Sequence, residues 1–150
     1  MVTVSLDITA PLYWWKEFDT YKVGTVANSC STMHKIHAKP FTLEDFSHDH
    51  LLDDYFETDN PVAILCFLVS TLNHFREKYL KTKDKKYWWQ LIQLLPSSYN
   101  QRRTVLLNYA VLRNMYRARK DHKLDEWIEF CDFITELPYS ELITGEVVSI

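Results

Sequence analysis

The sequence predicts an α+β fold, in which a helix-rich domain carries a small antiparallel sheet. Two stretches are strand-like: Val2–Ile8 alternates apolar and polar residues, and Val23–His34 is rich in Val, Thr, Ser and Cys. Most of the remaining chain repeats apolar residues at helical spacing. The chain has 150 residues, of which 47% are hydrophobic, and this predicts one domain over residues 1–150.

Prolines and capping residues predict where the helices begin and end. Pro11 opens a short aromatic helix, and Thr42 with Asp45 resembles a capping box. Pro61 suits the first position of a long helix, and Pro96 stops a short one. We therefore expect helices over residues 12–18, 42–56, 61–81, 87–95, 99–120 and 125–137. The apolar stripe expected on the longest of them consists of Ile64, Phe67, Leu68, Leu72, Phe75 and Leu80.

Several classes of protein are excluded by simple features of the chain. No apolar run is long enough for a membrane span, and the first residues lack the pattern of a signal peptide, so we expect a soluble, cytoplasmic protein. The two glycines exclude a Gly-rich phosphate loop. The three cysteines are widely spaced, which favours reduced thiols: Cys30, Cys66 and Cys131.

Charge is strongly segregated along the chain. Residues 41–60 and 124–150 each carry seven acidic residues and no Lys or Arg, whereas residues 98–123 carry seven bases and one acid. One interpretation is that the arginines of this basic segment pair with the two acidic segments, within the fold or across a subunit interface. The other is an anion site, because five of the seven bases are Arg. The acidic blocks argue against binding of double-stranded nucleic acid.

Two blocks of the chain resemble the flavin-dependent thymidylate synthases. In that family a strand and a proline precede a short aromatic segment with an Arg-Gln-Trp-like element, an Arg-His-Arg triplet, seven residues and Ser-x-Arg. Pro11–Met33 keeps this spacing without a gap, with Lys16-Glu17, Thr20-Tyr21-Lys22 and Cys30-Ser31-Thr32 at the motifs. Downstream, the family's Leu-Pro, helical Asn, Arg-rich helix end and nearby His match Leu95-Pro96, Asn108, Arg117, Arg119 and His122.

The resemblance implies the fold of these enzymes and a homotetramer with sites built from several subunits. Its departures argue against flavin chemistry. The family's Arg-His-Arg triplet, and an Arg two residues after the helical Asn, grip the flavin and its phosphates; here these positions are Thr20, Tyr21, Lys22 and Ala110. Each lost charge-assisted contact costs about 1.5 to 3 kcal/mol, so three losses weaken flavin binding by several orders of magnitude. We expect no cofactor; FAD belongs to the alternative interpretation.

The remaining polar residues still suit a nucleotide. Asn108 and Arg119, expected on one helix face about 16 Å apart, span the length of a nucleotide with its phosphate. Tyr21 stands where the family contacts flavin and could stack on a base. The Arg of Ser-x-Arg, which in the family helps to hold the deoxyuridylate phosphate, is Thr32. The nucleotide-binding residues that we expect are Lys16, Glu17, Tyr21, Lys22, Cys30, Ser31, Thr32, Asn108, Arg117 and Arg119.

Structural roles remain open for the same residues. Arg119 can serve only the dipole of its helix, and Asn108 can be a buried amide that bonds neighbouring backbone. A metal site at His34, His37, His48 and His50 fits no structural zinc spacing, so we expect no metal. Catalysis by Cys30 lacks a histidine near in sequence, and the catalytic residues stay unknown.

Together these patterns predict a nucleotide-binding protein. They favour a binding role over an enzymatic one. Such a protein could sequester a nucleotide or a cyclic nucleotide signal, as small phage-encoded sponge proteins do. The alternative is an active flavin-dependent thymidylate synthase-like methyl transferase, acting on deoxyuridylate or a modified pyrimidine nucleotide. A module that binds only protein partners is a third interpretation.

Overall fold

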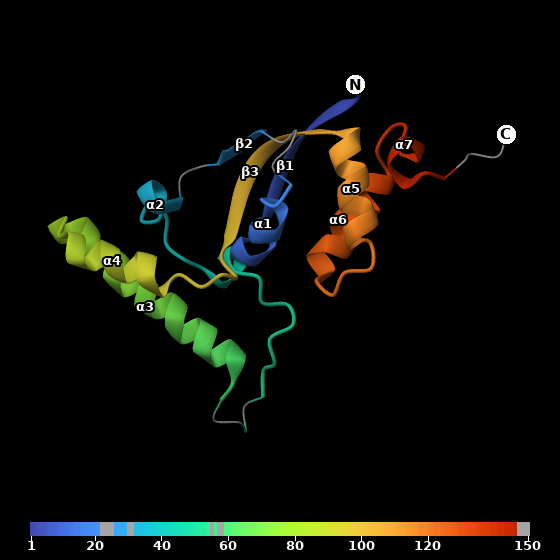
Figure 1. Ribbon diagram of the computed structural model, residues 1–150. Helices are drawn as coiled ribbons and strands as arrows, with labels where there is room; N and C mark the ends of the chain where they lie inside the picture. Colours follow the sequence, from blue (N-terminus) through green and yellow to red (C-terminus); the bar gives the residue numbers. More distant parts are fainter. Residues whose placement is uncertain (22–25, 30–31, 55, 57–58, 147–150) are drawn as a thin grey trace. The chain divides into compact units, whose positions relative to one another are not determined.

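A computed structural model of the chain describes residues 1–21, 26–29, 32–54, 56 and 59–146 (Figure 1). The chain forms two compact units: unit 1 comprises Met1–Ser29 with Arg102–Ile150, and unit 2 comprises Cys30–Gln101. The single domain expected over residues 1–150 stays a prediction. In chain order the elements are β1 (Thr3–Pro11), α1 (Leu12–Phe18), β2 (Val26–Ser29), α2 (Thr32–Lys35), the 3₁₀-helix η1 (Leu43–Asp45), α3 (Pro61–Thr82), α4 (Lys85–Leu94), β3 (Asn100–Asn108), α5 (Tyr109–Arg119), α6 (Asp125–Thr135) and α7 (Glu141–Thr144).

A three-stranded sheet with the order β1-β3-β2 organises unit 1. Strand β2 pairs with β3 in the antiparallel direction, with Val26 opposite Leu106. Two hydrogen bonds show that β1 also runs antiparallel to β3: the Tyr109 amide donates to the Val2 carbonyl, and the Thr104 hydroxyl donates to the Asp7 carboxylate. The predicted α+β fold with a small antiparallel sheet is therefore confirmed.

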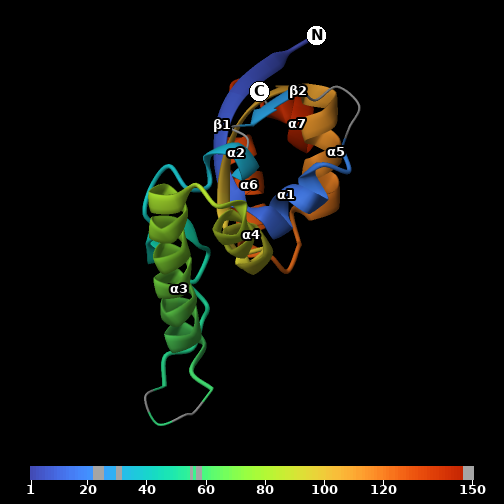
Figure 2. The ribbon, with the colours of Figure 1, turned by 90° about the vertical axis from the view of Figure 1, so that its left-hand side faces the viewer.

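The helices of unit 1 cover one face of this sheet (Figure 2). Alternation along β3 buries Val105 and Leu107 under the helices and leaves Thr104 and Leu106 on the open face. The core that they join is dominated by aromatic side chains, including Trp14 of α1. Its largest fully buried members in unit 1 are Trp14, Trp15, Trp127, Phe18, Leu107, Leu112, Met115, Ile134 and Ile143.

A pair of helices, α3 and α4, forms the framework of unit 2 (Figure 1). The side chain of Asn60 caps α3 by accepting a hydrogen bond from the Ala63 amide, as the following proline predicts. The inward face of α3 is rotated from the expected stripe, because Ile64 and Phe67 are exposed. The apolar residues of α3 that join the core of unit 2 are Leu65, Leu68, Val69, Leu72 and Phe75.

Three predicted elements are wrong in extent. The helix expected over residues 42–56 is only the 3₁₀-helix η1: its capping box forms, but Phe46 is already extended and bridges to Tyr99. The helix expected over residues 99–120 begins at Tyr109, because the preceding residues form β3. The strand expected over Val23–His34 is limited to β2 among the described residues, and α2 follows it. In the part of the chain that the structure describes, no helix combines the length and hydropathy needed to span a membrane.

Cys66 and Cys131 should react differently with thiol reagents. Cys66 is exposed on α3, whereas Cys131 is 2% exposed within α6, and burial raises the pKa of its thiol to about 11. Because the thiolate is the nucleophile, iodoacetamide at mildly alkaline pH should modify Cys66 and spare Cys131 in the native protein. The same thiol ionises near 9.0 in the unfolded chain, so its contribution makes stability fall as the pH rises from 9.0 to about 11, and the loss remains above that range. Peptide mass mapping checks the labelling, and equal modification of both residues before unfolding would contradict it.

Candidate functional site

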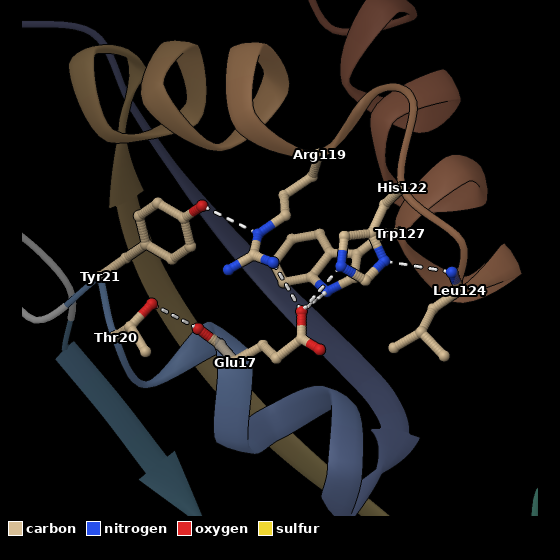
Figure 3. A network of polar contacts seen from close by, with 7 residues as sticks. All are labelled: Glu17, Thr20, Tyr21, Arg119, His122, Leu124 and Trp127. Atoms are coloured by element: carbon tan, nitrogen blue, oxygen red, sulfur yellow. Dashed lines mark hydrogen bonds and ion pairs between the residues drawn. The ribbon is translucent and has the colours of Figure 1, made fainter.

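Five side chains of unit 1 form a polar and aromatic group, the Glu17 cluster, shown in Figure 3. Its members are Glu17, Tyr21, Arg119, His122 and Trp127. One carboxylate oxygen, Glu17 Oε2, lies 2.6 Å from Arg119 Nη1, 3.0 Å from Trp127 Nε1 and 3.2 Å from His122 Nε2. Three elements thus meet at one oxygen: α1, the end of α5 and the start of α6.

Further contacts fix the orientation of two members of the cluster. The Leu124 amide donates to Nδ1 of His122 at 3.1 Å, which places the ring proton on Nε2, facing Glu17. Arg119 Nε donates to the Tyr21 hydroxyl at 3.0 Å, and the guanidinium carbon lies 5.0 Å from the centre of the Trp127 ring. Such cation–π packing with a charged hydrogen bond holds the guanidinium in one position.

Two polar atoms of the cluster remain open. Among the described residues, Arg119 Nη2 and Glu17 Oε1 have no hydrogen-bond partner, and Figure 3 shows them pointing away from one another. The side chains of Arg119 and Glu17 are 19% and 32% exposed, so both are within reach of a ligand. Because Glu17 already compensates the charge of Arg119, the cluster suits a polar, uncharged part of a ligand better than a free anion.

The structure brings together only part of the predicted site. Arg119 contacts both Glu17 and Tyr21, whereas Lys16 and Arg117 are exposed and make no contact with the Glu17 cluster among the described residues. Thr32 begins α2 in unit 2. Three further predicted residues lie outside the described part of the chain: Lys22, Cys30 and Ser31.

The expectation that Asn108 and Arg119 share one helix face is wrong. Asn108 is the last residue of β3 and has extended backbone angles, so α5 begins after it. Its side-chain oxygen accepts a hydrogen bond from the Val111 amide at 2.9 Å. This N-cap satisfies a backbone donor that the first turn of the helix leaves unpaired, which is the structural alternative that the sequence left open.

The arginines of the basic segment pair mainly with acids near the N-terminus. Besides Arg119 with Glu17, Arg103 lies 2.7 Å from Asp19 and Arg102 lies 2.8 Å from Asp7. Hydrogen bonds from Thr104, and then from Arg102, lower the pKa of the Asp7 carboxyl. In the described residues these pairs do not use the two acidic blocks, so the expected pairing within the fold occurs with different partners.

His122 and Trp127 were not among the expected site residues. The position of His122 matched the family pattern. A spacing signal was nevertheless present, because Arg119, His122 and Trp127 fall at the end of one helix and the start of the next. The sequence could not predict that all three residues contact α1, which lies more than a hundred residues away along the chain.

The antiparallel sheet with helices on one face agrees with known structures: the chain has the fold of the flavin-dependent thymidylate synthases. Its structure is similar to the crystal structure of the synthase ThyX from Helicobacter pylori complexed with FAD and dUMP. The TM-score is 0.66, the identity is 15%, and the match covers 95% of this chain and 72% of that chain. A 2.31 Å structure of the same enzyme with FAD and dUMP gives a TM-score of 0.64 and 16% identity, with the same coverage. No protein-family model and no curated protein matches the sequence.

Proposed function

We propose that this protein binds a nucleotide through the Glu17 cluster and does not perform flavin chemistry. The observation that carries the proposal is the pair of open polar atoms, Arg119 Nη2 and Glu17 Oε1, beside the aromatic rings of Tyr21 and Trp127. A guanidinium N–H suits a carbonyl or hydroxyl oxygen, and a carboxylate oxygen suits a ribose hydroxyl or an N–H of a base. The solved structures that share this fold are complexes with FAD and dUMP, which supports ligands of this class.

The described residues do not fit a flavin phosphate in the manner that the family resemblance implies. The Thr20 hydroxyl donates to the Glu17 carbonyl at 2.7 Å, and the Tyr21 hydroxyl accepts from Arg119. Ala110, on α5, has no polar side chain. Three of the four substituted positions therefore supply no positive charge, and the fourth, Lys22, lies outside the described residues. A pyrophosphate would meet too little compensating charge at these positions.

The role that follows from binding without chemistry is sequestration of a nucleotide or a cyclic nucleotide. Such a sponge would release its ligand unchanged when it is unfolded. The second candidate is a flavin-dependent methyl transferase, which the FAD and dUMP in the fold neighbours favour. Mass spectrometry of ligand recovered after heating separates the two, because an altered pyrimidine or a bound flavin would support the enzyme.

The proposal includes a homotetramer, in which several subunits complete each binding site. The segregated charges support it, because an acidic block of one chain can meet the basic segment of another. Large apolar residues on α3 are also exposed, with Phe67 at 75%. Native mass spectrometry of the purified protein would give the subunit number and any retained nucleotide together.

Replacing Arg119 with alanine should weaken nucleotide binding by about 1 to 3 kcal/mol, because a charged hydrogen bond to the ligand is lost. Arg113→Ala is the matched control: it removes the same charge from the same helix, but the exposed Arg113 makes no contact with the Glu17 cluster among the described residues. Thermal shifts with dUMP, UMP and cyclic mononucleotides would select the probe, and calorimetry would then compare the variants. Equal weakening in both, or no binding of any probe to the parent protein, would refute the proposed site.

A further inference from the structure

A hollow lies entirely within unit 2, where the end of α3 meets the start of α4. Its volume is about 330 Å³, within the range of pockets that bind small molecules. The lining side chains come from three segments, namely α2 with the turn after it, α3 with its C-cap, and α4. They are His34, His37, Tyr79, Lys83, Lys85 and Trp88, and we call this hollow the Lys83 pocket.

The charge at the Lys83 pocket is positive. Lys83 and Lys85 line it, and among the described residues neither has a carboxylate within ion-pair distance. Asp84, the acid between them, is directed elsewhere: one oxygen lies 3.3 Å from Lys86 Nζ, and the other accepts from the Lys86 amide. Two ammonium groups close to one hollow repel each other, and an anion bound between them would remove that repulsion.

Positive charge also extends beyond the residues that line the Lys83 pocket. Residues 76–86 contain six Lys or Arg and two acids, at the end of the α3–α4 pair. This local excess of positive charge does not stand out in the sequence, because the large acidic blocks elsewhere dominate the distribution of charge. A positive field of this kind attracts anions toward the pocket.

The walls are aromatic as well as cationic. Lys83 Nζ lies 5.6 Å from the centre of the Tyr79 ring, and the His37 ring packs edge-on against the same tyrosine at 5.0 Å. Nδ1 of His37 is buried and has no hydrogen-bond partner among the described residues. Trp88 adds a large flat side chain to the lining.

The local backbone holds these groups in place. Lys83 has a φ of 55° as the C-cap of α3, and its amide donates to the Tyr79 carbonyl at 2.7 Å. Asp84 caps the start of α4, so Lys85 occupies the first turn of a ten-residue helix. Arg76 fixes the opposite wall through a hydrogen bond of 2.9 Å to the His37 carbonyl.

We propose that the Lys83 pocket binds a phosphate-bearing small molecule that also carries a flat ring, with the phosphate at Lys83 and Lys85 and the ring against Trp88 and Tyr79. Lysine ammonium groups are point-charge binders of phosphate, and aromatic side chains stack on bases. This site shares no residue with the Glu17 cluster, and it stands whether or not that cluster binds a nucleotide.

Calorimetry with AMP, ribose 5-phosphate and adenosine tests both halves of the proposed ligand. AMP should bind most tightly, because ribose 5-phosphate lacks the ring and adenosine lacks the phosphate. The substitutions Lys83→Gln and Lys85→Gln should each weaken AMP binding about tenfold to a hundredfold. Lys81→Gln is the matched control, since Lys81 is an exposed lysine of the same helix that does not line the pocket. Melting temperatures would verify that the variants are folded.

Two further measurements keep this site distinct from the Glu17 cluster. AMP should shift the indole N–H signal of Trp88 in NMR spectra, and the effect of Lys83→Gln should persist in an Arg119→Ala background. Failure of the Glu17 proposal alone would leave both results unchanged. The proposal is overturned if AMP does not bind, if Lys81→Gln weakens binding as much as Lys83→Gln does, or if only single-stranded RNA binds and all lysines contribute equally.

Discussion

Glu17→Ala should lower the free energy of unfolding by about 2 to 3 kcal/mol, because one carboxylate oxygen serves three donors. Its loss leaves the Arg119 guanidinium, 19% exposed, without a counter-charge. It also leaves the indole N–H of the fully buried Trp127 without its acceptor. An unpaired buried donor costs more than the hydrogen bond itself contributes. Urea denaturation followed by circular dichroism measures the change.

Two variants show which part of this effect comes from the charge. Glu17→Gln keeps an oxygen that can accept from Trp127 but removes the ion pair with Arg119, so its cost should be intermediate. Glu129→Ala removes an exposed carboxylate from α6 and should change stability by no more than about 0.5 kcal/mol. If Glu17→Ala is no more destabilising than Glu129→Ala, the cluster does not join α1 to α5 and α6 in solution.

Leu112→Ala should be still more destabilising, with a loss of about 3 to 4 kcal/mol. Leu112 is fully buried on α5, in the core that α5 shares with α1 and α6. Removal of its side chain costs the transfer energy of the lost carbons and leaves a cavity, since aromatic neighbours such as Trp14 cannot easily collapse into the space.

Asn114→Ala controls for the change in helix propensity. Asn114 is exposed two residues further along α5, and alanine favours the helix slightly, so stability should stay the same or rise. The same urea denaturation compares the two variants. A loss below about 1 kcal/mol for Leu112→Ala would contradict the close packing of this core.

The parts of the fold with local causes were predictable from the sequence. Alternation predicted β1, and Pro61 after a capping residue predicted the start of α3. The helix expected over residues 42–56 failed because its capping box competes with long-range contacts. Phe46 is 2% exposed and bridges to Tyr99, so burial of this ring prevails over continuation of the first turn.

The boundary between β3 and α5 shows a different limit. Val105, Tyr109, Leu112 and Tyr116 recur at helical spacing, yet Val105 and Leu107 face the core as alternate residues of a strand. The spacing of Val105 and Tyr109 suits both structures, and only pairing with β1 and β2 decides between them. The displaced boundary makes Asn108 the N-cap of α5, where the sequence predicted a residue inside the helix.

The candidate site was predictable only in part for the same reason. Family spacing placed Glu17, Tyr21 and Arg119 in one group, and the structure brings these three together. Their mutual pairing could not be predicted, because the contacts join residues about a hundred positions apart. The Lys83 pocket was missed because charge was compared between long blocks, in which a local excess disappears.

Ser29 pairs with Arg103 in the sheet, although residues 30–102 separate them along the chain. The pairing of β2 with β3 must therefore close a very long loop, with a large loss of chain entropy, before any of its hydrogen bonds forms. The neighbouring helices α5, α6 and α7 need no such closure. During refolding, the C-terminal helices should gain protection from hydrogen exchange first, and the strand that contains Ser29 should be the last to join.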